Sequence, residues 1–509
     1  MLRSTTPGTS LEILALLCAL CPGCPQRPSP AAPPRATPRR PFPAARLVPA
    51  EAPLVVLVRE PARLFAAMDR LESVLPEVAL RGPLDRRDLR AAGLDPHGSA
   101  GLYSIGTDLT LVLAIEDRRR LAGYFGRPGS EVKAWAWRRL PGAMVAVMGD
   151  HLLLSLSPVG AESTRADGRT LEGWLEDTRR SVAESSLAAS GRLDALLRRA
   201  GEHRDLVAFL RPLPLNRATS LMRQRLGHRR NVPRCNRFDQ GLAAVKLLGL
   251  ALSLRPRQTV GEAWLELSPA AHAELQRAVR PPFAVPATLW DRAPARVRLG
   301  MSPDYLRRLA RDLPRATDGC GAVADALIAL EPARLMARLD LLDHVRGQLT
   351  AVALSAKPRG RRVRLEAAAV TGMPGTAVQR LIAFLVAGPW ARWERVAGRR
   401  VHRFNPPSLV SGNVLFSLGD DRVRIATSAE LMAPLYEPAP RGRRGDVVDL
   451  HLEPGRLDLQ ALAETGLAAR LSPDPRRGAR VLGRFDRLWL GARLGRRRVR
   501  FELGYRLSE

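Results

Sequence analysis

Apolar residues along this chain repeat one arrangement four times: a short strand-like run, then a proline, then leucines at helical spacing. In the first copy, the apolar run 54–58 leads to Pro61, after which Leu64, Met68 and Leu71 recur every three or four residues. Proline suits the first turn of a helix because its missing N–H would have no intrahelical partner there. The other three copies carry their prolines at the following positions: Pro212, Pro303 and Pro454.

The four copies predict an internal duplication, with two copies in each half of the chain. The two prolines of each half lie 151 residues apart, and the turn Gly149-Asp150 of the first half is matched by Gly419-Asp420 in the second. We therefore expect two similar domains, residues 46–285 and 286–509. Pro61 and Pro303 should begin equivalent elements, as should Pro212 and Pro454.

The fold class that the pattern predicts is α+β. Residues 499–507 alternate between apolar side chains and polar ones, with Gly504 at one of the polar positions, which is typical of a strand with one buried and one wet face in an antiparallel sheet. Several short hairpins are separated by stretches with helical spacing, including 322–342. The prediction is that each half consists of an antiparallel sheet with helices packed on one face.

The N-terminal segment 1–24 has the features of an export signal. A short apolar run, 13–21, follows a single basic residue, Arg3, and is too short to cross a bilayer. Cys24 follows Gly23, as in bacterial lipoprotein signals, in which the cysteine becomes the lipidated first residue. Residues 25–45 are rich in proline and predict an extended linker. A plain secretory signal remains the alternative to the lipoprotein type.

The chain carries a large excess of positive charge, most of it from arginine. The chain has 80 Lys and Arg against 50 Asp and Glu, a formal net charge of +30, and only Lys133, Lys246 and Lys357 are lysines. One interpretation is an anion-binding surface for nucleic acid or acidic glycan. The other is a coding bias toward arginine, because the arginines are spread along the whole chain.

Six of these arginines lie close together in the sequence and form the candidate anion-binding cluster. A loop clamping a phosphate or carboxylate polymer would use such residues, although the same run also fits an ordinary solvated loop. Only one aromatic residue, Phe238, accompanies them, so base stacking has little support. The cluster consists of Arg223, Arg225, Arg229, Arg230, Arg234 and Arg237.

Motifs for catalysis, metal binding and cofactor binding are absent from the sequence. It contains no P-loop, no His-Glu-x-x-His and no Gly-x-Ser-x-Gly, and its eight histidines are scattered. Asp420-Asp421 reads as a hairpin turn rather than a metal site. After cleavage at Cys24, Cys235 and Cys320 would remain, and the spacing leaves open whether they pair. We expect no metal, no cofactor and no catalytic residue.

Three segments resemble a family of uncharacterised, exported, lipoprotein-like bacterial domains. They are Val48-Pro49-Ala50-Glu51-Ala52-Pro53 before a valine-rich strand, Gly93-Leu94-Asp95-Pro96, and Arg400-Val401-His402-Arg403-Phe404 before Gly419-Asp420. The resemblance covers about residues 46–507, and its motifs are turns of low specificity. It implies a compartment and a fold and no chemistry.

The sequence therefore predicts a non-enzymatic protein of the cell envelope, in the periplasm or at the outer membrane. It would be tethered by a lipid on Cys24 and would act by binding or scaffolding, with protein partners unknown. The first alternative is a binder of anionic polymers. The second is an envelope enzyme whose site assembles from dispersed residues.

Overall fold

The computed structural model describes most of the chain from residue 42 onward. The described residues are 42–74, 86–105, 108–125, 134–136, 143–156, 171–200, 204–212, 244–255, 257–283, 285–301, 348–359, 362–372, 392–404, 413–419, 422–437, 445–464 and 475–508. By contacts they divide into two compact units, which meet in the sequence between Ser268 and Pro269. Cys24, Cys235 and Cys320 lie outside the described residues, as do Pro303, Asp420, Asp421 and the predicted helical stretch 322–342.

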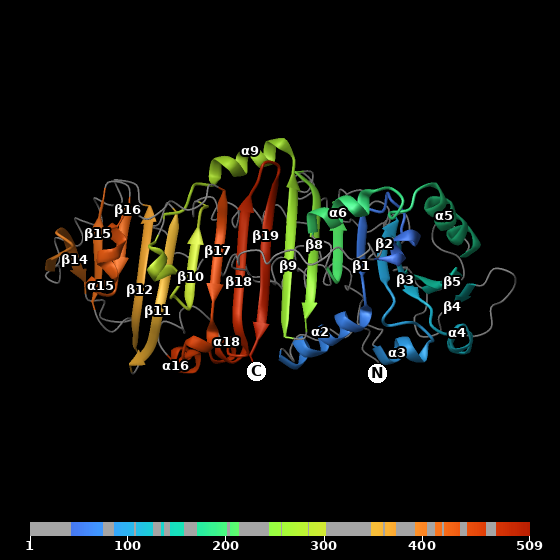
Figure 1. Cartoon of the computed structure of the whole chain (residues 1–509), viewed down its shortest axis with the longest axis horizontal. Coiled ribbons are helices and arrows are strands. Elements are labelled where there is room, and N and C mark those ends of the chain that lie inside the picture. Colours follow the sequence, from blue (N-terminus) through green and yellow to red (C-terminus); the bar gives the residue numbers. More distant parts are fainter. Residues whose placement is uncertain are drawn as a thin grey trace, which may run out of the picture. The chain divides into compact units, whose positions relative to one another are not determined.

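Unit 1 is dominated by an antiparallel sheet, whose strands run side by side from blue to yellow-green in Figure 1. In hydrogen-bonded order the strands are β4-β5-β6-β3-β2-β1-β7-β8-β9. The strands are β1 (Leu54–Val58), β2 (Ala100–Ile105), β3 (Asp108–Ala114), β4 (Ala134–Ala136), β5 (Ala143–Met148), β6 (His151–Leu156), β7 (Leu206–Leu210), β8 (Val245–Arg255) and β9 (Gln258–Leu267). The helices are η1 (Pro43–Leu47), α2 (Pro61–Val74), α3 (Arg86–Ala91), α4 (Arg118–Phe125), α5 (Leu171–Glu184) and α6 (Arg192–Ala200).

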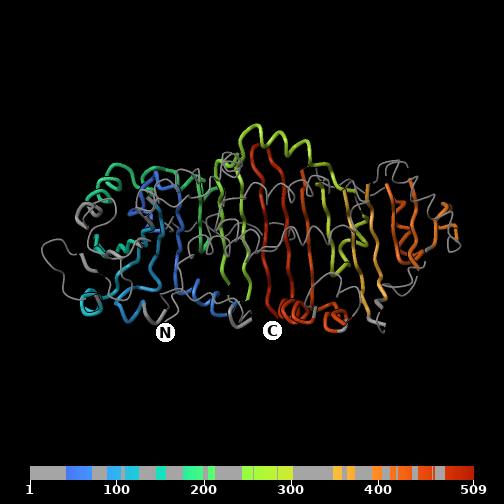
Figure 2. Tube along the Cα trace, turned by 180° about the vertical axis from the view of Figure 1, so that it is seen from behind, coloured from blue at the N-terminus to red at the C-terminus, as the bar shows by residue number. Residues whose placement is uncertain are grey.

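Unit 2 is built in the same way, and its strands are the orange and red ones in Figure 2 together with yellow-green β10. Their order is β13-β14-β15-β16-β12-β11-β10-β17-β18-β19. The strands are β10 (Ala295–Leu299), β11 (Leu349–Arg359), β12 (Arg362–Gly372), β13 (Arg392–Val396), β14 (Arg399–Phe404), β15 (Val414–Leu418), β16 (Arg422–Ala426), β17 (Asp446–Leu452), β18 (Phe485–Leu494) and β19 (Arg498–Leu507). The helices are α9 (Pro269–Ala278), α10 (Ala287–Trp290), α15 (Ala429–Met432), η3 (Ala433–Tyr436), η4 (Pro454–Arg456), α16 (Leu459–Ala463) and α18 (Pro475–Leu482).

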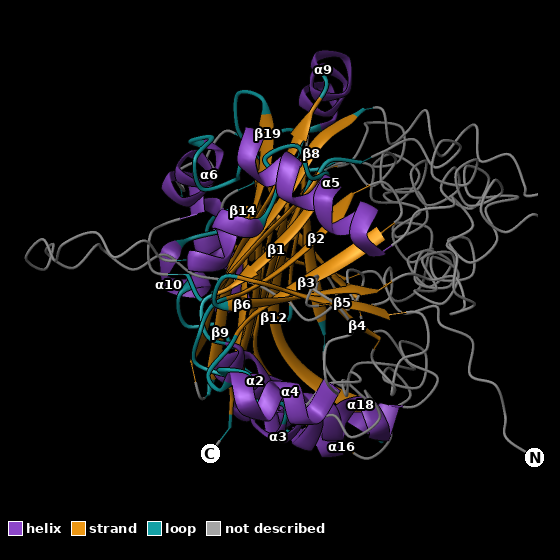
Figure 3. Cartoon of the chain, turned by 90° about the vertical axis from the view of Figure 1, so that its right-hand side faces the viewer, coloured by secondary structure: helices purple, strands orange, loops and turns teal. Residues whose placement is uncertain are grey.

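The predicted α+β class, with a layer of helices on one face of each sheet, is wrong. Antiparallel sheet dominates the described structure, and most described helices are short and lie at the ends of strands, as Figure 3 shows for α2, α3 and α18. Sequential hairpins satisfy the backbone N–H and C=O groups of each strand within the sheet. Several strands reach ten or eleven residues, for example β8 and β11. The sheet therefore forms the main layer, and helices add local cover.

The two units share one strand order around a central antiparallel pair, which is β1–β7 in unit 1 and β10–β17 in unit 2. In both units the strand order on either side of this pair is the same, apart from the extra edge strand β13. Matching backbone hydrogen bonds close both ends of each pair: Arg59 N to Asp205 O (2.8 Å) and Arg211 N to Pro53 O (2.7 Å) in unit 1, and Gly300 N to Val447 O (2.9 Å) and Glu453 N to Pro294 O (2.7 Å) in unit 2.

These bonds align the two pairs residue by residue. Val55 faces Phe209 across the unit 1 pair, and Arg296 faces His451 at the equivalent place in unit 2. Leu57 and Val207 correspond in the same way to Arg298 and Asp449. Of the four prolines, Pro61 begins α2 and Pro454 begins η4, whereas Pro212 directly follows β7 without a described helix.

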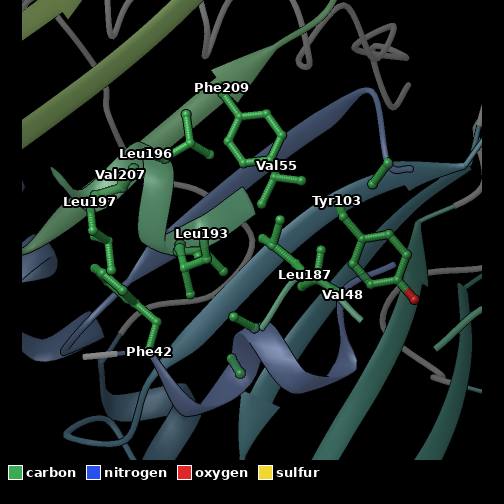
Figure 4. Close-up of a cluster of buried hydrophobic side chains, with 14 of the residues drawn as sticks. Phe42, Val48, Val55, Tyr103, Leu187, Leu193, Leu196, Leu197, Val207 and Phe209 are labelled. Atoms are coloured by element: carbon green, nitrogen blue, oxygen red, sulfur yellow. The ribbon is translucent and has the colours of Figure 1, made fainter. Parts of the chain in front are cut away.

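The core of unit 1 lies on one face of its central pair. Val55, Phe209 and Tyr103 from the sheet belong to one buried cluster with Phe42 next to η1 and Leu193 of α6 (Figure 4). All five are nearly inaccessible to solvent. Burial of a side chain of this size contributes roughly 1.5–3 kcal/mol, so this face is a principal source of the stability of unit 1.

A Trp–Gly contact repeats in the two units with its members exchanged. In unit 1 Trp264 of β9 faces Gly249 of β8, and a Cβ atom at Gly249 would lie only 2.0 Å from Cε2 of the Trp264 ring. At the aligned positions of unit 2, Trp489 stands on β18 and Gly504 on β19. Both tryptophans are buried. Gly249 must be a glycine because the ring of Trp264 occupies the space of the facing side chain, and unit 2 pairs Trp489 with a glycine in the same way.

We predict that exchanging this pair in unit 1 is tolerated better than either single change. Gly249→Trp alone overfills the face, and Trp264→Gly alone leaves a cavity that should cost about 3–5 kcal/mol. The double variant copies the arrangement of unit 2, so its loss of unfolding free energy should be smaller than the sum of the two single losses. Urea unfolding of all three variants measures this, and strictly additive losses would contradict the alignment of the units.

Candidate functional site: an ionic row on the sheet of unit 2

The candidate site lies on one face of β10, β17 and β18. Successive side chains of a strand point to opposite faces, so Asp449, His451 and Glu453 project to the same side of the sheet. Cross-strand pairing places Arg296 and Arg298 of β10 directly beside His451 and Asp449. We call the following residues the ionic row: Arg296, Arg298, Asp449, His451, Glu453 and Arg487.

Glu453 is the centre of the ion pairs in the row. Its Oε1 lies 3.0 Å from Nε2 of His451 and accepts a hydrogen bond from Nη2 of Arg487 at 3.1 Å. Its Oε2 accepts from Nη1 of Arg456 at 2.8 Å. Burial by itself would raise the pKa of Glu453, but the hydrogen bonds from Arg456 and His451 and the charge of Arg487 outweigh it and hold the pKa below its usual value. Glu453 is therefore a fixed negative charge with all its partners in place.

Arg296 and Arg298 lie against the indole ring of Trp290, the last residue of α10. The Cζ atom of Arg298 is 4.1 Å from the ring centroid and that of Arg296 is 5.4 Å away, within cation–π range. Arg296 also donates a hydrogen bond from Nη1 to the backbone oxygen of Trp290 at 2.9 Å. Burial lowers the pKa of Arg296. Both guanidinium groups therefore pack against the same indole ring.

Asp449 is only loosely paired. Its Oδ2 lies 4.0 Å from Nη1 of Arg298, at the outer limit of an ion pair. Burial raises the pKa of Asp449, although the charges of Arg298 and Arg296 oppose the shift. Asp446, at the start of the same strand, is better compensated because Nε of Arg493 donates to it at 2.9 Å. Negative charge in the row is therefore concentrated at Glu453.

His451 is the most deeply buried ionisable residue of the row, with 3% of its side chain exposed. Burial lowers its pKa, and the nearby charges of Arg296 and Arg487 act in the same direction, against the hydrogen bond to Glu453. The imidazole is therefore neutral near pH 7. When Nε2 carries the hydrogen that bonds to Glu453, Nδ1 is left with a free lone pair.

The same positions in unit 1 are apolar. Val55, Leu57, Val207 and Phe209 align with Arg296, Arg298, Asp449 and His451, and each is at most 1% exposed within the core of Figure 4. A central strand pair of this fold therefore does not need charges at these places. Buried ion pairs replaced by apolar residues of similar volume are often neutral or more stable. Stability alone gives no reason for the ionic row, which makes it a candidate for function.

The chemistry of the row favours binding of an anion over binding of a metal. No group of three His, Cys, Asp or Glu side chains within the described ranges is placed to hold a metal ion. In the row itself, arginines lie beside both carboxylates, and Arg456 and Arg487 bond to the oxygens of Glu453. Thr350, the hydroxyl residue paired with Arg298 on β11, is fully buried and donates its hydroxyl to the backbone oxygen of Phe283 at 2.6 Å.

The site residues expected from sequence are not those that the structure brings together. Lipid attachment at Cys24 and the arginine cluster 223–237 fall outside the described residues, so both stay predictions. Sequence reasoning missed the ionic row, although Ala295-Arg296-Val297-Arg298-Leu299 and Asp449-Leu450-His451-Leu452-Glu453 alternate polar and apolar side chains. That alternation indicates two strand faces. It does not indicate that the polar face would pack against Trp290.

Comparisons with known proteins add little. No protein-family model and no curated protein matches the sequence. Among solved structures, crystal forms I, III and IV of TP0453 are similar to this chain with TM-scores of 0.24–0.26 and 9–10% sequence identity. They cover 46–47% of this chain and 84–88% of their own. A likeness this weak carries no argument about fold or function. In the described part of the chain, no helix is long and apolar enough to span a membrane.

We predict that the four residues of the row on the central strand pair can be replaced by their unit 1 counterparts without loss of stability. The variant Arg296→Val/Arg298→Leu/Asp449→Val/His451→Phe should unfold cooperatively in urea, with a free energy that is unchanged or higher by about 1–4 kcal/mol. Asp449→Val alone is the matched control. It should lower the free energy of unfolding because it leaves Arg298 without its carboxylate. A loss of several kcal/mol in the fourfold variant would make the row a structural element.

We also predict that His451 weakens the fold on acidification. Its folded-state pKa lies below the ordinary 6.5, so below pH 6.5 the unfolded chain takes up a proton that the folded chain does not. The contribution of His451 to stability is therefore complete above pH 6.5 and decreases as pH falls through the folded-state pKa.

Urea unfolding of wild type and His451→Phe between pH 7.5 and 5 tests this. The variant should lose less stability over this range, whereas His97→Phe, at an exposed histidine, should behave as wild type. The same acid loss in wild type and His451→Phe would show that His451 titrates normally.

Proposed function

We propose that this chain is a non-enzymatic binding protein of the bacterial cell envelope, exported and held at the membrane by a lipid on Cys24. The observation that carries the binding role is the ionic row, which replaces an apolar core face at aligned positions of a repeated fold. Such a replacement is expected where charged groups are kept for a partner rather than for stability.

Binding is favoured over catalysis by the state of the row's ionisable groups. Glu453 is engaged by His451, Arg456 and Arg487 and keeps a low pKa, so it is a poor acid at neutral pH. Thr350 uses its hydroxyl on a backbone oxygen and is no ready nucleophile. We therefore infer that the contact with Glu453 holds the imidazole ring of His451 in place.

The envelope location is supported by the N-terminal sequence and by the family resemblance. The run 13–21 ends just before Gly23-Cys24, and a proline-rich segment follows that can hold the folded units away from an anchor. A single acyl chain gives only marginal membrane binding. The several chains of a bacterial lipoprotein cysteine would meet that need.

We predict that Cys24→Ser converts a membrane-bound protein into an unprocessed precursor. Without lipid, the apolar run falls well short of the roughly 20 residues of a membrane span. Membrane fractionation and the N-terminal mass of both proteins measure this, with Cys21→Ser as the matched control that should leave processing unchanged. If wild type and Cys24→Ser fractionate alike and have the same N-terminal mass, the proposed anchoring is wrong.

A further inference from the structure

Four polar atoms of the ionic row and its neighbour are buried without a hydrogen-bond partner among the described residues. They are Nε of Arg296, Nε of Arg298, Nδ1 of His451 and Nε1 of Trp489. His451 and Trp489 face each other across β17 and β18, and Arg296 adjoins His451 on β10. Buried polar groups in folded proteins nearly always have partners, and each unpaired one costs about 1–3 kcal/mol. Four at one place indicate a missing ligand.

Donors dominate this set. Arginine and tryptophan side-chain N–H groups can only donate, so the partner of three of the four atoms must be an acceptor. Nδ1 of His451 becomes a fourth donor when the imidazole takes up a proton.

The net charge of the side chains around these atoms is positive, which also favours an acceptor that carries negative charge. Arg296, Arg298, Arg456 and Arg487 supply four positive charges, and Glu453, Asp449 and Asp291 supply three negative ones. Glu502, which faces Gly491 from β19, is paired with Arg500. Glu453 is already shared among its partners, and Arg298 lies 4.0 Å from Asp449. The terminal nitrogen Nη1 of Arg296 bonds to a backbone oxygen, and no carboxylate of the described residues lies within ion-pair distance of this side chain. An incoming negative charge would balance the row.

A position without a side chain lies beside these donors. Gly491 follows Trp489 on the same face of β18 and is paired with Asp449, and a Cβ atom at Gly491 would meet nothing nearer than 3.9 Å. The aligned position in unit 1 is Ala251, which is fully buried. Unit 2 therefore lacks a side chain where unit 1 has one.

We propose that the ionic row binds one oxyanion group, a phosphate or a carboxylate, between Arg296, Arg298 and Trp489. The proposal rests on the binding role proposed above and names the chemistry of its ligand. Guanidinium groups bind oxyanions with charge-assisted hydrogen bonds, and the indole N–H adds a neutral donor. The oxyanion is either a free small molecule or the headgroup of an anionic lipid.

Two consequences follow from the neighbours of the site. Trp290 covers Arg298 at 4.1 Å, so an anion that reaches Nε of Arg298 changes the surroundings of this ring. His451 is faced by Glu453 on its own strand, by Arg296 on β10 and by Arg487 and Trp489 on β18. A bound anion favours its protonated form, so binding takes up a proton and strengthens as pH falls toward the pKa of His451.

Calorimetric titration of the purified full-length chain with inorganic phosphate, at pH 6 and pH 8, tests the proposal. Wild type should bind one phosphate, with a change in tryptophan fluorescence that Trp290→Phe removes. Sulfate, whose charge is the same at both pH values, should bind more tightly at pH 6. Arg296→Met and Arg298→Met should each weaken binding about tenfold or more, since hydrogen bonds between charged groups are strong. Arg506→Met, at a 63% exposed arginine paired with Asp486, is the matched control and should bind as wild type.

Gly491→Ala keeps every donor and adds a methyl group at the adjoining position, so it should weaken binding while circular dichroism and urea unfolding remain as in wild type. This variant tests the site even if either arginine variant fails to fold. Vesicles of phosphatidylglycerol, compared with phosphatidylcholine, separate a lipid headgroup from a free oxyanion as the source. No phosphate binding by wild type, or equal binding by wild type, Arg296→Met and Arg506→Met, would overturn the site. Neither result would affect the Cys24 experiment, so the two proposals fail separately.

Discussion

The pairing of two short strands that lie far apart in the sequence is the constraint on which each unit depends. β1 pairs with β7, and β10 pairs with β17, in each case across about 150 intervening residues. All other described strands of a unit extend the sheet outward from this pair. The backbone bonds at both ends of the pair match between units, so register is fixed by the main chain. The side chains on this frame were then free to diverge.

Divergence took opposite directions in the two units. In unit 1 the pair carries Val55, Leu57, Val207 and Phe209, which pack against η1 and α6. In unit 2 the aligned residues are charged or titratable, and the apolar cluster lies beside them, toward β11, β12 and β14–β16. Unit 1 places its largest apolar area at the centre of the sheet, whereas unit 2 gives up that area for an ionic row that binds an oxyanion. The exchanged Trp–Gly pair places the same two residue types at this position of both units, on opposite strands.

Local sequence signals predicted the strands well and the layers poorly. All four strand–proline copies contain a strand at the expected place, and Pro61 begins a helix as its missing N–H suggests. The helical layer was wrong because helical spacing reports one apolar stripe and not which element covers it. Likewise, alternation around Arg296 and Asp449 indicates two faces, but the burial of the polar face depends on Trp290, which approaches through tertiary contacts. The unpartnered nitrogens of the row are a property of three neighbouring strands together and have no signature in any one of them.

The central claim is that unit 2 keeps a charged strand pair in order to hold an oxyanion. The most direct measurement is a crystal structure of the chain grown with phosphate. We expect density for one anion within hydrogen-bond distance of Nε of Arg296, Nε of Arg298 and Nε1 of Trp489, next to Gly491. Density that instead shows these nitrogens bonded to other groups of the protein, with no anion among them, would contradict it.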